Sequence, residues 1–318
     1  MAIYNAYDAI GQREDLTDII YDISPTTTPF MSSIGKSKAT AVFHEWQTDS
    51  LAAATTNNAA VEGADASDAT LSPTTRLGNY TQILQKTIKV SGTLDSVNKA
   101  GRKSEKAYQL AKASQELKRD LETILLANQG RSAGTTNSTA RKMGSLLSWI
   151  KTNSSVQTNG GDPTTIGVST RTDGNTRTFT ETLLKEVVAE VFASGGTPKI
   201  LMVGATGKQK VSSFTGLSAY RYNVNGGTGG AQATIVGAAD VYLSDFGSMS
   251  VVPNIFMRTR DALILDPEYA ALAYLRPFQT NELAKAGDAD KTQILVECTL
   301  EVKNEAAHGI VADLNMAL

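Results

Sequence analysis

The sequence predicts an α+β fold built around one long helix, and three stretches carry that prediction. From Arg102 to Asn128, apolar or small side chains recur with the 3.6-residue period of an amphipathic helix. From Gln293 to Lys303, apolar and polar side chains alternate as they do along a β-strand. Lys199 to Val203 indicates a buried strand, which a turn and a short helix follow. The chain is therefore expected to combine a sheet that packs on the long helix with an α/β unit.

The long helix, called the spine helix below, has an apolar stripe and a charged face. The stripe consists of Ala107, Leu110, Ala111, Ser114, Leu117, Leu121, Ile124 and Leu125. The opposite face carries Glu105, Gln109, Lys112, Glu116 and Arg119. Charges of opposite sign four residues apart, such as Lys118 and Glu122, are expected to pair on the helix surface. Gly130 is expected to lie just beyond the end of the helix.

Residues 1–35 predict an N-terminal arm. Pro25 and Pro29 disfavour regular structure around them. Ile19, Ile20 and Phe30 are nevertheless more apolar than a free linker requires. One interpretation is a flexible leader. We favour an arm that becomes ordered by lying on another subunit, so that it matters for assembly and little for the fold of the subunit itself.

Residues 36–90 predict an extended loop in the form of a β-hairpin. Ala41–Gln47 alternates, and Tyr80–Val90 is rich in residues that favour strands, so these two stretches are expected to pair. The segment between them contains no lysine or arginine as far as Thr75, but it carries Glu62, Asp65 and Asp68. The tip of the hairpin is therefore acidic.

Such an acidic segment has little apolar surface with which to offset the entropy of becoming ordered. We therefore hypothesise that the tip docks over basic side chains on the spine helix of an adjacent subunit, where Lys112 and Arg119 lie. The alternative is an acidic loop that is merely soluble.

The remaining residues divide into four segments. Residues 91–150 contain the spine helix, and residues 151–178 are predicted to form a surface loop. Residues 179–262 are predicted to form most of the α/β unit, opening with a helix that Thr178 caps and that ends at Gly195. Residues 263–318 are predicted to return as strands, with Tyr269–Leu283 pairing with Gln293–Lys303 and both packing on the spine helix. The buried face of the second helix is expected to consist of Leu183, Leu184, Val187, Val188, Val191 and Phe192.

Composition and motifs predict no catalytic residue, no metal site and no cofactor. The net charge of −2 indicates no general attraction to nucleic acid or membrane. No apolar run approaches the roughly 18 residues of a membrane-spanning helix. His44 and His308 are the two histidines and lie far apart in the sequence, while Cys298 falls on the apolar face of a strand. An enzyme is therefore not expected.

One glycine-containing turn, Gly204–Lys208, lies between a strand and a helix and is the candidate for a phosphate-binding loop. That motif requires a glycine where Met202 stands and a hydroxyl where Gln209 stands. A plain strand-to-helix turn explains the stretch better, and an α/β enzyme that binds a nucleotide here is the alternative from another functional class.

The order of arm, extended hairpin, spine helix, α/β unit and returning strands resembles the major capsid proteins of tailed bacteriophages with the Hong Kong ninety-seven fold. Three strings carry the resemblance most closely. They are AGRKSEKAYQLAKASQELKRDLETILLANQ (100–129), AYLRPFQTNELAKAGDADK (273–291) and LEVKNEAAHGIVADL (300–314).

This resemblance implies that the chain self-assembles, through hexamers and pentamers, into an icosahedral shell that encloses double-stranded DNA. It implies that residues 91–150 and 263–318 form a peripheral domain and that residues 179–262 form an axial domain. It also implies a virion protein that is assembled in the host bacterial cytoplasm with a portal, with a separate scaffolding protein if one is used, and possibly with decoration proteins. A bacterial compartment protein of the encapsulin type, which shares this fold, is the close alternative.

The resemblance also raises covalent cross-linking, because in the founding member of the fold a lysine of the extended loop joins an asparagine of a neighbouring subunit. Here no lysine lies between Lys38 and Lys86. We therefore predict shells that are held together without isopeptide bonds. Boiled particles on a denaturing gel should give one band near 33.7 kDa, and a ladder of multimers would contradict the prediction.

Overall fold

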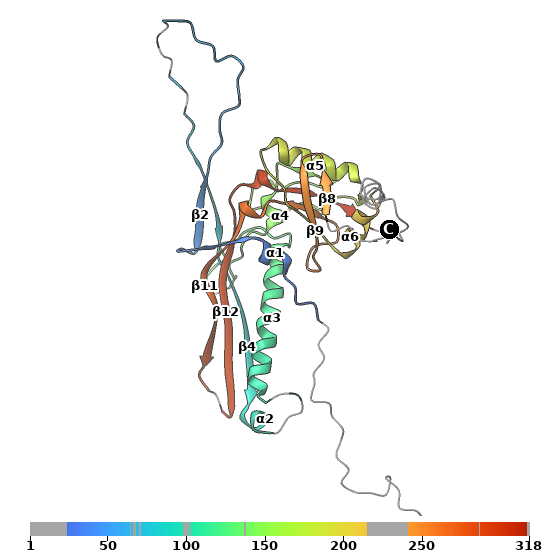
Figure 1. The fold of residues 1–318 in the computed structure, drawn as a ribbon. Helices are drawn as coiled ribbons and strands as arrows, with labels where there is room; N and C mark the ends of the chain where they lie inside the picture. The colour runs from blue at the N-terminus through green and yellow to red at the C-terminus, as the bar shows by residue number, and fades with distance from the viewer. Residues whose placement is uncertain are drawn as a thin grey trace, which may run out of the picture.

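The computed structural model describes residues 24–63, 65, 68–69, 71–97, 101, 103–136, 138–214, 241–285 and 287–316. Figure 1 shows an elongated body in which a long helix lies beside a sheet, an α/β unit at one end, and a narrow hairpin that projects beyond that end. The predicted arm residues Ile19 and Ile20 lie outside the described residues.

The spine helix is the longest of the described helices. They are α1 (Pro29–Ser33), α2 (Gly92–Ser96), α3 (Glu105–Leu125), α4 (Leu146–Trp149), α5 (Glu181–Ala193) and α6 (Ala205–Ser212), with 3-10 turns at Pro267–Tyr269 and Glu305–Ala307. None of these described helices is long and apolar enough to cross a membrane.

The strands form two larger sheets and two pairs. The first sheet has the order β1 (Gly35–Lys38), β11 (Ala270–Leu283), β12 (Ala289–Val302) and β4 (Gln82–Ser91). The second has the order β5 (Ser154–Ser155), β13 (Gly309–Val311), β10 (Ala262–Leu265), β7 (Ile200–Val203), β9 (Gly247–Pro253) and β8 (Val241–Ser244). The pairs are β2 (Phe43–Thr48) with β3 (Thr75–Tyr80), and β14 (Leu314–Asn315) with β6 (Arg177–Thr178).

The predicted spine helix is confirmed as α3, but it is shorter at both ends. Its N-cap is Ser104, whose side chain accepts a hydrogen bond from the N–H of Ala107, so the helix starts at Glu105. The last turn closes at the C-cap Leu126. The described residues of the predicted helix beyond these bounds, residues 103–104 and 126–128, lie outside α3, because capping satisfies groups at the helix end.

Two acidic residues of α3 lie on different sides from those predicted. Glu105, assigned to the charged face, is buried. Glu122 is fully buried, whereas Lys118 is exposed, so the predicted surface pair between them is wrong. The reason is tertiary: other segments of the chain supply donors to Glu122, as described below.

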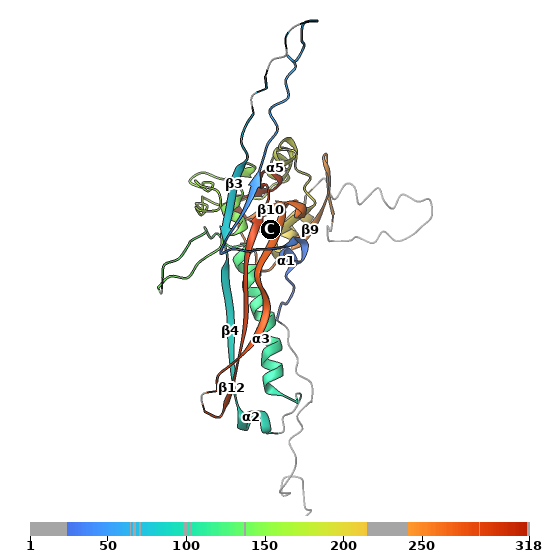
Figure 2. The same cartoon turned by 90° about the vertical axis from the view of Figure 1, so that its left-hand side faces the viewer.

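The sheet packs on α3 as predicted, and Figure 2 shows β4, β12 and α3 running side by side. Leu117 and Leu121 of α3 belong to one core cluster with Ile294, Val296 and Cys298 of β12. Each fully buried leucine contributes about 1.5–3 kcal/mol relative to its exposed state. The alternation of β12 therefore correctly identified the side chains that face the helix.

The middle of the second face of β12 is buried as well, although its side chains alternate with those that face α3. Leu295, Glu297 and Thr299 are all nearly inaccessible. The reason is that neighbouring segments cover this face: Thr81 and Arg141 both donate hydrogen bonds to the Glu297 carboxylate. The carboxylate of Glu297 can therefore be buried on this face because it finds donors.

The extended hairpin differs from the prediction in its second strand. β2 pairs with β3, whereas β4, predicted as the returning strand, pairs antiparallel with β12. The chain changes sheets at Thr81, whose N–H donates to the carbonyl of Val42 at 2.8 Å. Beyond this point Leu84 and Ile88 pack against the core under α3. Burial of these side chains therefore favours the body over the hairpin.

The α/β unit is built as predicted around β7 and α5, with two corrections. The N-cap of α5 is Thr180, not Thr178, because Thr178 belongs to β6 and pairs with Asn315. Phe192, assigned to the buried face, is 52% exposed. The helix does end at the predicted glycine: Gly195 has a φ of +87°, a conformation that favours glycine.

Residues 151–178, predicted to form a surface loop, are largely irregular but do not all lie at the surface. Asn153 and Arg171 are buried, and the segment contributes β5 to the second sheet and β6 to a pair with β14. The abundance of turn residues correctly indicated irregular backbone, but exposure does not follow from irregularity when buried polar groups are satisfied.

His308 carries a prediction about pH. Burial lowers its pKa from 6.5 to about 4. Below pH 6.5 the unfolded chain binds a proton that the folded chain does not, so this stabilisation is complete above pH 6.5 and is lost as the pH falls towards 4. The loss should reach about 3 kcal/mol of unfolding free energy.

Denaturant unfolding between pH 4 and 7 checks this, with His308→Asn as the comparison because an asparagine oxygen can still accept from the N–H of Asp266. Burial raises the pKa of Asp261 to about 6, which contributes with the opposite sign: its stabilisation is lost as the pH rises through 6. The readout is therefore the difference between the two profiles. A difference that does not change with pH would contradict the prediction.

Candidate assembly surfaces

The base of the hairpin is tied to the body by buried polar side chains. Asn79 is fully buried and donates to the carbonyls of Gly144 at 3.0 Å and Leu300 at 2.8 Å. On the neighbouring strand His44 lies 3.3 Å from the Glu301 carboxylate. Because buried hydrogen bonds of this kind are costly to break, the subunit itself sets the direction of the hairpin.

Aromatic contacts reinforce the same anchor. Trp46 of β2 packs against Trp149 of α4 with ring centroids 5.2 Å apart, and Phe43 packs against Tyr80 at 4.6 Å. The Arg131 guanidinium lies over the Phe43 ring at 5.2 Å. Each such pair contributes about 0.5–1.5 kcal/mol beyond burial. These contacts therefore hold the base of the hairpin rigidly against the body.

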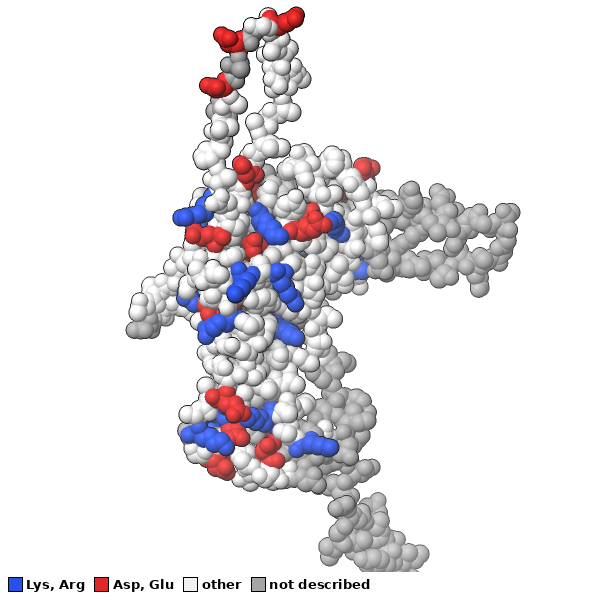
Figure 3. All heavy atoms as spheres, turned by 60° about the vertical axis from the view of Figure 1, so that its left-hand side comes forward, with Lys and Arg blue, Asp and Glu red and all other residues white. Residues whose placement is uncertain are grey.

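The described residues of the hairpin tip, residues 49–74, are exposed to solvent, unlike those at the base. The predicted site residues Glu62, Asp65 and Asp68 are all exposed. Figure 3 shows acidic side chains at the tip and no basic ones beside them in that view. Apolar side chains are also bare: Leu51 is 99% and Leu71 is 89% exposed. In the described residues, no ion pair involves these three carboxylates.

The predicted basic surface on α3 is mixed in charge. Lys112 is exposed, but Arg119 lies 5.6 Å from the centroid of the Phe256 ring. Glu116 and Asp120 share this surface and both contact Lys86, at 3.0 and 3.1 Å. The surface predicted to receive the tip therefore carries acidic as well as basic side chains, and Lys86 of strand β4 pairs with the acidic ones.

Basic side chains near the two ends of α3 are engaged within the chain. Lys106 lies 2.8 Å from Glu282, and Arg141 lies 2.7 Å from Glu297. Arg131 donates to the carbonyl of Gly78. Figure 1 places the hairpin at one end of the molecule and α3 in the other half. Contact between tip and helix therefore requires two copies of the chain.

A groove between α3 and β11 is a surface that sequence reasoning missed. It has a volume of about 510 Å³ and is lined by Ala107, Leu110, Ala111, Ser114, Phe278, Gln279, Thr280 and Ile294. The stripe predicted these helix residues to be buried, but Ala107 and Ala111 are exposed. Small side chains on the helix leave space that the sheet does not fill. The small side chains of Ala107 and Ala111, which neighbour each other along the stripe, are the sequence feature that could have predicted this groove.

Phe30, predicted to contact another subunit, is buried in the core of its own subunit and is 1% exposed. The short helix α1 places it there, and the strand that follows, β1, pairs in parallel with β11. The described end of the predicted arm is therefore part of the subunit fold. The apolar character of Phe30 correctly indicated that its side chain is buried. The surface that buries it, however, belongs to the same subunit.

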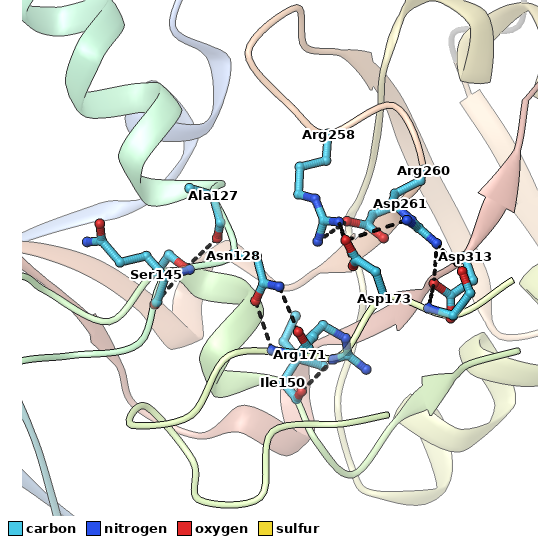
Figure 4. Close-up of polar contacts among 12 residues, drawn as sticks. Ala127, Asn128, Ser145, Ile150, Arg171, Asp173, Arg258, Arg260, Asp261 and Asp313 are labelled. Carbon is cyan, nitrogen blue, oxygen red and sulfur yellow. Dashed lines mark hydrogen bonds and ion pairs between the residues drawn. The ribbon is translucent and has the colours of Figure 1, made fainter. Parts of the chain in front are cut away.

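Arginine and aspartate side chains tie the α/β unit to residues 151–178, as Figure 4 shows. Arg258 contacts the Asp173 carboxylate at 2.5 and 2.6 Å. Arg260 lies 2.8 Å from Asp313, which also accepts from the N–H of Gly174 at 2.7 Å. The hydrogen bond of Arg258 lowers the pKa of Asp173, despite some burial. These contacts are structural and present no open site.

The strand-to-helix turn at Gly204 shows no phosphate cradle. The Lys208 ammonium donates to the Val251 carbonyl at 3.1 Å, towards the sheet. Within the described part of the chain, no group of three or more histidine, cysteine or acidic side chains is placed to hold a metal ion.

A family model for the SU10 major capsid protein matches residues 3–315 of the chain. The chain belongs to this family. The predicted recognition as a capsid protein of a tailed phage is thereby confirmed at the level of the family.

Individual relatives agree with the family. The chain is 43% identical over 129 residues to the major capsid protein of Escherichia phage Phieco32. That match covers 41% of this chain and 37% of the relative, so it spans little more than a third of the relative's length.

Solved structures confirm the predicted fold. The capsid protein of cyanophage A-1(L) has a TM-score of 0.64 at 11% identity, covering 95% of this chain and 97% of that one. The capsid of a native GTA particle has a TM-score of 0.62 at 12% identity, covering 98% and 97%. The SrpI encapsulin of Synechococcus elongatus has a TM-score of 0.57 at 10% identity, covering 100% and 98%. At these identities the likeness concerns the fold alone.

Proposed function

We propose that this chain assembles with copies of itself into the closed icosahedral head of a tailed phage. Membership of the SU10 family supports the proposal. The observation that carries it is the hairpin: its base is held by buried contacts, while Leu51 and Leu71 at its tip are almost fully exposed. Isolated apolar side chains on a projecting segment gain stability only when a neighbour covers them.

The tip is proposed to dock near α3 of an adjacent subunit. The groove between α3 and β11 can receive apolar side chains such as Leu71, and the exposed Lys112 lies on the same helix to meet Glu62, Asp65 or Asp68. An exposed ion pair contributes only about 0–1 kcal/mol. Repetition over many identical contacts makes small contributions decisive for closure of a shell.

The finer parts of the proposal concern the oligomers that make up the shell, its contents and the partners with which it assembles. The shell would consist of hexamers and pentamers of this chain and would enclose double-stranded DNA without sequence preference. Assembly would take place in the bacterial cytoplasm with a separate scaffolding protein, a portal and possibly decoration proteins. The small net charge of −2 fits a protein that contains DNA without binding it tightly.

An encapsulin-like compartment that encloses enzymes is the second candidate, since the SrpI encapsulin shares the fold. Negative-stain microscopy and sedimentation of the purified chain, expressed with its neighbouring genes, test both. Closed megadalton particles that protect DNA from nuclease are expected. Closed particles that hold only protein would favour the compartment. A chain that remains a monomer or dimer would overturn shell formation altogether.

A further inference from the structure

Glu122, in the last turn of the spine helix, accepts hydrogen bonds from two distant segments. One oxygen, Oε1, accepts from the N–H of Phe30 at 2.7 Å and from Nδ2 of Asn254 at 2.7 Å. The other, Oε2, accepts from the N–H of Met31 at 2.8 Å. The side chain is completely buried. Three N–H donors from outside α3 therefore converge on one carboxylate.

The first segment is α1, which lacks a cap of its own. Thr28 occupies the N-cap position but makes no side-chain hydrogen bond, and Pro29 at the first helical position has no N–H. The N–H groups of Phe30 and Met31 are the donors that an N-cap would normally satisfy. Glu122 thus caps α1 from another helix, and Figures 1 and 2 both show α1 lying against α3.

The second segment belongs to the α/β unit. Asn254 follows β9 directly, is 1% exposed, and its N–H donates to the carbonyl of Val203 in β7 at 2.8 Å. Its Oδ1 accepts from the N–H of Phe256 at 2.9 Å. These bonds hold the amide group in one orientation, with Nδ2 aimed at Glu122. The carboxylate therefore joins the spine helix, the arm and the α/β unit.

In the part of the chain that the structure describes, this buried carboxylate has no balancing cation. Among the described residues, no lysine, arginine or histidine forms an ion pair with Glu122. Burial raises its pKa, against the lowering effect of the donors from Met31, Phe30 and Asn254. Burying a carboxylate costs folding free energy unless all of its hydrogen-bond donors are in place. The arrangement is therefore sensitive to the position of each of the three segments.

We propose that Glu122 is the positioning residue that seats residues 28–34 of the predicted arm on the subunit, and that through Asn254 it couples this seating to the α/β unit. The chain before Thr28 then starts from a defined point on the subunit. The proposal concerns the subunit itself, so it stands or fails independently of the kind of shell that the chain builds.

Hydrogen exchange of the purified full-length chain, followed by mass spectrometry, tests the seating. Glu122→Gln keeps the shape but turns one acceptor into a donor facing an N–H. It should raise exchange in residues 28–34 by about tenfold or more. Glu116→Gln, on the exposed side of the same helix, is the matched control and should leave these residues unchanged. Unchanged protection of residues 28–34 in Glu122→Gln would overturn the proposal.

Asn254→Ala tests the coupling, because it removes one donor without touching α1. A smaller rise in exchange over residues 28–34 is expected together with the local rise after β9. If only the local rise occurs, the coupling is overturned. If either variant raises exchange evenly over the whole chain, Glu122 acts on global stability alone and the positioning role is overturned.

Discussion

Reversing the charge of the hairpin tip is expected to abolish or severely reduce the formation of closed shells. The change is Glu62→Lys with Asp65→Lys and Asp68→Lys. Like charges would then face Lys112 of the neighbouring subunit, and the error would be repeated at every contact in the shell. The subunit should remain folded, because all three side chains are exposed. Sedimentation and microscopy measure the shells, and circular dichroism measures the fold.

Neutral replacements by glutamine and asparagine at the same three positions are the matched control and should have an intermediate effect. Adding Lys112→Glu and Arg119→Glu to the reversed tip should partly restore assembly. The restoration is expected to be incomplete because Arg119 also stacks on Phe256 in its own subunit. Normal assembly of the reversed tip at both low and high salt would exclude electrostatic docking as the contact that seats the hairpin.

Replacing Arg171 by leucine is expected to cause the largest loss of stability, about 3–5 kcal/mol of unfolding free energy. Its side chain is buried, donates to the carbonyl of Ile150 at 2.8 Å and contacts the Asp162 carboxylate. Burial lowers the pKa of Arg171, while Asp162, Asp261 and Asp313 raise it. Removing the cation leaves these carboxylates without one of their partners.

Denaturant unfolding measures the loss. Arg76→Leu is the matched control, since Arg76 also pairs with a carboxylate, Glu45 at 3.0 Å, but its side chain is 71% exposed. It should change the unfolding free energy by no more than about 0.5 kcal/mol. Equal effects of the two substitutions would show that burial does not set the energy of the Arg171 contacts.

The contrast between α3 and the hairpin shows how far local patterns reach. The period of α3 and the alternation of β12 predicted both elements and their shared core, because hydrophobic periodicity follows directly from backbone geometry. The pairing of β4 was mispredicted, although its β-forming character was recognised. Local sequence identifies a strand, but the choice of partner depends on which distant segment buries its side chains best.

Local patterns were enough to predict the α+β class, the spine helix, the strand that packs on it, the α/β unit and the acidic tip of the hairpin. Each depends on residues that are near one another in the chain. Tertiary structure alone decided that Phe30 belongs to its own subunit, that Arg171 is buried in a segment of loop composition, and that Glu122 accepts from two distant segments. The physical reason is that a polar or apolar side chain requires a partner, and the sequence states the requirement without stating which remote segment meets it.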